Sequence, residues 1–148
     1  MADGASRKGA AILAGGLAAG VGDSLLALLL YRVPLRVIYQ SVAAGLLGRA
    51  SYGGGLRTAA LGMFLHFFIA TTAAAVYVVA GRYAPVLARR PVPCGLAYGV
   101  AVYLFMKYVV LPLSAVPRLT PFDGAAMAGH AVLVGLPIAL LASAFVRR

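Results

Sequence analysis

The chain has 148 residues, of which 63% are hydrophobic and only 11% are charged. Soluble domains carry charge on about a quarter of their residues, so this composition excludes an ordinary soluble protein and predicts a membrane protein. The net charge of +10 does not indicate nucleic acid binding, because most of the Lys and Arg residues flank apolar runs, where arginines meet lipid headgroups. We therefore expect the protein to contact the lipid bilayer and not to bind nucleic acid. The single cysteine, Cys94, excludes an intrachain disulfide and a metal site built on a cysteine pair.

The first apolar run, residues 10–31, predicts a transmembrane helix, because about 20 helical residues cross the core of a bilayer. It follows Arg7 and Lys8 as the core of a secretory signal would, but it is longer than a signal core and three similar runs follow. Residues 34–48 begin with a proline, are too short to span and are too apolar for a loop. They predict a short interfacial or re-entrant helix. The sequence SYGGG at 51–55 predicts a flexible turn, because consecutive glycines resist regular structure.

Residues 58–80, 94–113 and 125–146 predict the second, third and fourth transmembrane helices. Pro137 lies inside the fourth helix and is expected to kink it. The prediction is thus an all-α, polytopic protein whose residues 1–148 form a single membrane domain. Four spans place both termini on one side, which has seven Lys and Arg residues, Arg147 and Arg148 included, against five on the other. The positive-inside rule then favours cytoplasmic termini.

Small residues at helical spacing predict where the helices pack, because lipid tails offer no hydrophobic reason for helices to associate. Gly16 and Gly20 form a GxxxG pattern in the first helix, and Gly95 and Gly99 form another in the third. These glycines predict close packing either within the chain or along the seam of a homo-oligomer.

Each of the four transmembrane runs carries one ionisable side chain of particular interest. In chain order they are Asp23, His66, Lys107 and His130. Counted from the side of the termini, all four lie about 12 to 15 residues into their helices, a spread of about 4–5 Å at 1.5 Å per residue. A lone charge near the centre of a bilayer costs about 3 kcal/mol on insertion scales. An ion pair between Asp23 and Lys107 is therefore the cheapest arrangement, and we expect it. Such a polar layer either fixes which helix faces meet or lines a site for protons, ions or a small solute.

Two histidines at the depth of a carboxylate could also bind a metal or pass a proton. The ammonium of Lys107 disfavours a second cation, so we expect no metal and no cofactor. Tyr103 lies one helical turn before Lys107 and, with Gln40, is a candidate accessory residue. Ser24 follows Asp23 directly, so their side chains point about 100° apart and are not expected to form a relay.

Several segments resemble a family of small bacterial inner-membrane proteins of unknown function, the YagU-type proteins. They are YQSVAAGLLG, TAALGMFLHFFIATTAAAVY and YGVAVYLFMKYVVLPLSAVP, and the resemblance covers roughly residues 10 to 146. In that family the positions matching His66 in LHF and the segment VVLPLS recur, whereas the position matching Lys107 is often Asn or another polar residue. The resemblance implies a four-helix protein of the bacterial inner membrane and brings no activity.

No nucleotide-binding, hydrolase or metalloprotease motif is present, so we expect no enzyme. The sequence favours a non-enzymatic inner-membrane protein whose polar layer organises its helix bundle. Two alternatives stay open: a small transporter or channel subunit for protons, ions or a solute, and an accessory subunit of a larger membrane complex.

Overall fold

The computed structural model describes residues 2–146, with side chains described for residues 6–145, so Arg147 and Arg148 lie outside it. The described chain contains four helical stretches long and apolar enough to cross a membrane. They are Ser6–Tyr31 in α1 (Ala2–Tyr31), α3 (Gly55–Ala80), Pro91–Leu113, and Gly124–Phe145. The third consists of α5 (Pro91–Phe105), the turn η2 (Met106–Val110) and α6 (Leu111–Leu113). The fourth consists of α7 (Gly124–His130), the turn η3 (Ala131–Gly135) and α8 (Leu136–Val146). The predicted all-α, polytopic class is confirmed.

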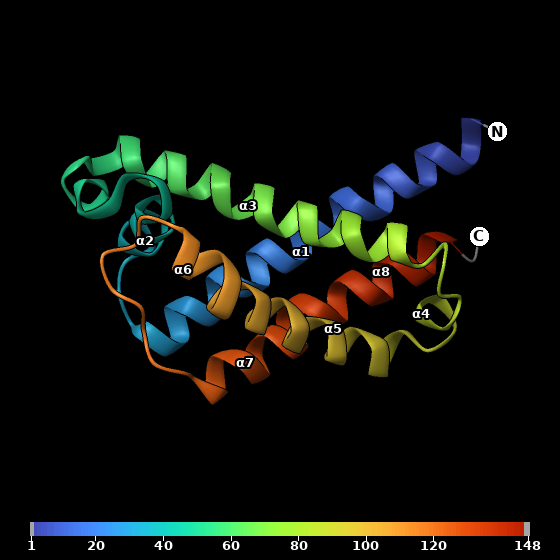
Figure 1. The fold of residues 1–148 in the computed structure, drawn as a ribbon. Coiled ribbons are helices and arrows are strands. Elements are labelled where there is room, and N and C mark those ends of the chain that lie inside the picture. The colour runs from blue at the N-terminus through green and yellow to red at the C-terminus, as the bar shows by residue number, and fades with distance from the viewer. Residues whose placement is uncertain (1, 147–148) are drawn as a thin grey trace.

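The short helix predicted near residues 34–48 is present as α2 (Leu35–Leu47), preceded by Pro34. It lies beside the first half of α3, at the end of the bundle where α1 ends (Figure 1). The flexible turn predicted for residues 51–55 is wrong, because a 3₁₀ helix, η1 (Gly48–Gly53), occupies most of it. Ser51 is fully buried there, and its carbonyl accepts a 2.6 Å hydrogen bond from the hydroxyl of Thr58.

The four spans form a row rather than a closed ring. Helix α1 packs against α3 on one side and α8 on the other, while α5 packs against α8, α7 and η3. Both described ends of the chain, and the short helix α4 (Val86–Arg89), lie at the end of the bundle opposite α2 (Figure 1). We refer to these as the terminal end and the α2 end. Between α3 and α5 an apolar groove of about 450 Å³ remains, lined by Phe68, Val76 and Phe105 among others.

Two prolines widen the helices that contain them. The N–H of Leu111, just before Pro112, bonds to the carbonyl of Met106, and that of Leu136, just before Pro137, bonds to the carbonyl of Ala131. Both bonds reach back five residues, so η2 and η3 are π-helical turns. A proline ring crowds the carbonyl four residues earlier, and a widened turn relieves that contact. The kink expected at Pro137 thus takes the form of a π-helical turn.

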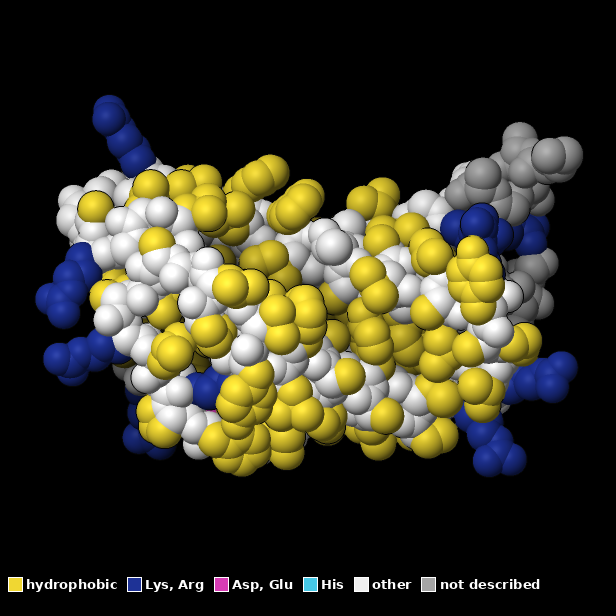
Figure 2. Space-filling model, in the orientation of Figure 1, with side chains coloured by type: hydrophobic (Ala, Val, Ile, Leu, Met, Phe, Trp, Pro, Cys, Tyr) yellow, Lys and Arg dark blue, Asp and Glu magenta, His cyan; other side chains and the backbone are white. Residues whose placement is uncertain are grey.

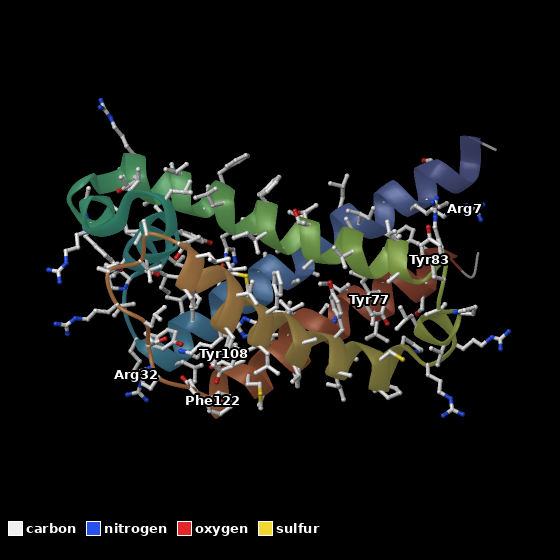
Figure 3. The ribbon with its side chains drawn as sticks, viewed as in Figure 1. Arg7, Arg32, Tyr77, Tyr83, Tyr108 and Phe122 are labelled. Carbon is white, nitrogen blue, oxygen red and sulfur yellow. The ribbon has the colours of Figure 1, made fainter. Side chains whose placement is uncertain are left out.

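Charged side chains gather at the two ends of the molecule. On the face shown in Figure 2, nearly all Lys and Arg side chains project from the ends, and hydrophobic side chains cover the middle. Arg7 and Tyr83 lie at the terminal end, and Arg32 and Phe122 lie at the α2 end (Figure 3). Large apolar side chains such as Leu29, Leu56 and Phe64 are exposed. This distribution is the one expected of a protein whose middle faces lipid and whose ends face headgroups.

Candidate functional site

Three of the four predicted polar-layer residues meet in the structure. The carboxylate of Asp23, on α1, lies between two imidazoles: its Oδ1 is 3.4 Å from Nε2 of His130, on α7, and its Oδ2 is 3.9 Å from Nδ1 of His66, on α3. The side chains are 27% (Asp23), 19% (His130) and 11% (His66) exposed. We call these three residues the Asp23 cluster. Each contributing span is different, so the cluster joins three of the four transmembrane stretches.

His66 is held in place by the turn of α1 that carries Ser24. Its Nε2 lies 2.8 Å from the carbonyl oxygen of Gly20 and 3.2 Å from the hydroxyl of Ser24. The Ser24 hydroxyl donates to the same Gly20 carbonyl at 2.8 Å. The hydroxyl of Tyr39, on α2, lies 3.1 Å from the Ser24 hydroxyl. The absence of a side chain on Gly20 permits this approach, since a Cβ there would lie 2.6 Å from the ring of Phe67.

Sequence reasoning set Ser24 aside because it cannot face Asp23, and it missed Tyr39 altogether. The two neighbours on α1 do not form a relay with each other, but both approach His66 from different sides of its ring. The signal that could have found Ser24 is its position one helical turn after Gly20, where a serine hydroxyl can bond to a backbone carbonyl.

His130 is held by its own helix and by α5. Its Nδ1 lies 2.9 Å from the carbonyl oxygen of Ala126, one turn earlier. The ring of Tyr103 meets the imidazole edge-on, with the centroids 5.3 Å apart. The Tyr103 hydroxyl also accepts a 2.9 Å hydrogen bond from the backbone N–H of Asp123. Tyr103 is therefore adjacent to the cluster, as its candidate role required.

The predicted ion pair between Asp23 and Lys107 is wrong. Among the described residues, the groups within 4 Å of the Asp23 carboxylate that can carry positive charge are the two histidines. The ammonium of Lys107 instead donates to the carbonyl of Thr120, to its hydroxyl at 2.9 Å and to the carbonyl of Pro121 at 2.7 Å. The physical reason is helix order: α5 packs on the fourth span rather than on α1, so α7 and its preceding loop separate the two residues.

Gln40 also lies away from the cluster. Its side-chain amide donates to the carbonyl of Gly55 at 3.0 Å and to the hydroxyl of Thr58 at 3.4 Å, and only 3% of the residue is exposed. It joins α2 to the first turn of α3.

The four predicted packing glycines lie at helix contacts within the chain. A Cβ on Gly16 or Gly20 would meet α3 at Thr71 or Phe67, and one on Gly95 would lie 2.8 Å from the methyl of Ala139. At Gly99 a Cβ would lie 2.6 Å from the Cα of Ala131. These two glycine faces are thus covered by the chain itself.

The Asp23 cluster lines one wall of a cavity at the α2 end, which we call the Asp23 cavity. It has a volume of about 450 Å³. Apart from the cluster, most of its lining is apolar, from α1, the connector after it, α2, α6 and α7: Leu26, Ala27, Leu30, Val33, Val37, Ile38, Val42, Leu111 and Ala126. A second cavity of about 560 Å³ adjoins it, and Tyr31, Ser41, Leu111 and Thr120 line both. The second cavity also carries Arg49 and Arg118.

No group of three or more His, Cys, Asp or Glu side chains in the described part of the chain is arranged to hold a metal ion. The Asp23 cavity itself presents acid–base groups, one carboxylate and two imidazoles, beside apolar walls.

No family model, no curated protein and no solved structure matches the chain. The candidate function accordingly rests on the geometry of the site and on the four membrane-spanning helices.

Proposed function

We propose that this chain is a non-enzymatic inner-membrane protein that works as a small proton-linked transporter or channel subunit through the Asp23 cluster. The observation that carries the proposal is the position of the cluster on the wall of a cavity rather than in closed packing between helices. A polar layer whose only task was to organise the bundle would need no such space. Ionisable groups within a membrane that face a cavity are typical of proton and solute pathways.

Imidazole and carboxylate together suit proton transfer. An imidazole changes charge near neutral pH, so it can take up and release a proton under ordinary conditions. Asp23 lies 3.4 Å from the ring of His130 and 3.9 Å from that of His66, so a proton can pass along the cluster with small movements of the side chains. The adjoining cavity with Arg49 and Arg118 supplies a route from the headgroup level at the α2 end.

The excess of Lys and Arg at the terminal end supports cytoplasmic termini, with the Asp23 cavity then facing the other side of the membrane. This orientation belongs to the same proposal.

Proton flux into liposomes tests the function. The protein is reconstituted with a pH-sensitive dye inside, and a potassium diffusion potential drives the protons. We expect a flux that Asp23→Asn abolishes and that Asp3→Asn, which removes the same charge outside the apolar span, leaves intact. A flux that is absent in the unaltered protein, or equal in both variants, refutes the proposal.

A further inference from the structure

Each imidazole of the Asp23 cluster already uses one ring N–H in a hydrogen bond to a backbone carbonyl. A backbone carbonyl can only accept a hydrogen bond, so the 2.8 Å contact to Gly20 places the ring hydrogen of His66 on Nε2. Its other nitrogen, Nδ1, is then an acceptor, and this is the atom that faces Asp23.

His130 shows the same arrangement with its two nitrogens exchanged. The 2.9 Å contact to the carbonyl of Ala126 places the ring hydrogen on Nδ1. The acceptor Nε2 is then the atom 3.4 Å from the Asp23 carboxylate.

The cluster therefore presents acceptors alone toward its centre: two carboxylate oxygens and two imidazole nitrogens. Lone pairs that face one another without a donor are unfavourable, the more so beside apolar walls, where the charge is poorly solvated. A bound proton relieves this by making one of the four atoms a donor. An ammonium group does so more fully, because it brings a positive charge and three N–H donors at once.

The surroundings of the cluster suit a cation with an apolar body. The Asp23 cavity is lined mainly by aliphatic side chains, and no Lys or Arg is among the described residues that line it. The ammonium of Lys107 is occupied by Thr120 and Pro121. The remaining titratable groups nearby are Tyr31, on the cavity wall, and Tyr39, which contacts Ser24. Tyr103, whose ring meets that of His130, and Asp123, whose backbone N–H donates to the Tyr103 hydroxyl, lie on the α5 and α7 side. Arg49 and Arg118 line the adjoining cavity and not this one.

We propose that the Asp23 cavity binds a primary ammonium ion with an apolar tail, and that this ligand displaces the proton of the cluster. The exchange makes and breaks no covalent bond other than that of the proton: the protonated cluster and the ammonium ion give the ammonium-bound cluster and one free proton. The inference rests on the proposed function, because it names the solute that a proton-linked site of this kind would carry.

Calorimetry on the protein in nanodiscs tests the inference, with hexylammonium as the ligand and empty nanodiscs subtracted. Titration in two buffers of different ionisation enthalpy gives the number of protons released for each ligand bound. We expect about one proton, affinity at least tenfold lower for 1-hexanol, and a loss of at least tenfold in Asp23→Asn with none in Asp3→Asn. His130→Phe keeps a ring beside Tyr103 but removes one acceptor, and we expect several-fold weaker binding.

Equal affinity for hexylammonium and 1-hexanol, or equal binding in Asp23→Asn and the unaltered protein, overturns the inference. Proton flux without ammonium binding would remove the inference and leave the proposed function standing. Ammonium binding without any proton-linked flux would overturn the proposed function and leave ammonium binding at the Asp23 cavity standing.

Discussion

Replacing Asp23 by Asn separates a cluster that holds the bundle together from one that binds a ligand. If the carboxylate were needed to hold the helices, its loss would destabilise the protein. The acceptor-only geometry predicts the opposite result. The Asn side chain keeps the shape, and its amide nitrogen can donate to the acceptor nitrogen of His130, now 3.4 Å from Oδ1.

The magnitude follows from two contributions. A carboxylate at this depth costs up to about 3 kcal/mol on insertion scales, and the cavity relieves part of that cost because 27% of the side chain is exposed. One new hydrogen bond contributes about 1 kcal/mol. No uncompensated charge remains after the change, because each imidazole then carries only the one N–H hydrogen that donates to its backbone carbonyl. We therefore expect Asp23→Asn to leave the free energy of unfolding unchanged or to raise it by up to a few kcal/mol.

Unfolding in mixed micelles with increasing SDS, followed by the far-ultraviolet circular dichroism of the helices, measures this change. Asp3→Asn is the matched control, because it removes one carboxylate from the start of α1, before the apolar span. A loss of more than about 1 kcal/mol in Asp23→Asn, roughly fivefold in the unfolding equilibrium, with no loss in the control, would refute the reasoning. The layer would then be one that organises the bundle.

Three further changes test the contacts around the site. Combining Asp23→Asn with Lys107→Met should give additive effects on unfolding within about 0.5 kcal/mol, because the residues share no contact; a larger coupling in a double-mutant cycle would restore the ion pair. Gly62→Ala should lower the thermal midpoint sharply, because its Cβ would overlap a backbone carbonyl of α2. The control Gly9→Ala, with nothing within 4 Å of its Cβ, should be neutral or stabilising; equal effects would contradict the packing. Asp123→Ala should cost about 0.5–2 kcal/mol in SDS unfolding, because Oδ1 caps α7 through two backbone N–H groups at 2.9 and 3.1 Å; no change would show that the cap contributes nothing.

The sequence predicted that polar residues of different helices lie at a common level, but it did not predict which of them are partners. Counting residues from helix ends placed Asp23, His66, Lys107 and His130 at one level, and the structure brings Asp23 and the two histidines together but not Lys107. Pairing also depends on which helices are neighbours, and no pattern in a single chain encodes that the fourth span lies between the first and the third. The sequence analysis chose Lys107 as the partner of Asp23 because their charges are opposite. In the structure the partners are the two histidines, because their helices are the ones adjacent to α1.

Local features show a similar division. The helix at 34–48 was predictable because its proline and apolar spacing act within a few residues. The glycines at 53–55 suggested flexibility, yet η1 ends at Gly53 and α3 begins at Gly55, because Ser51 is buried and its carbonyl is bonded to Thr58 on α3. That tertiary contact overrides the local preference of the glycines for a turn.

The π-helical turns before Pro112 and Pro137 have a consequence for insertions and deletions in this chain. Losing one residue from an α-helix turns every later side chain by about 100° and misaligns the face that packs on its neighbours. A π-helical turn already contains one residue more than an α-helical turn. Deleting one residue from η3, together with Pro137→Ala to remove the crowding ring, would therefore return the helix to regular geometry while α8 keeps the same face toward α1. Each of these two turns is thus a position in the described spans where the chain can become one residue shorter without misaligning the bundle.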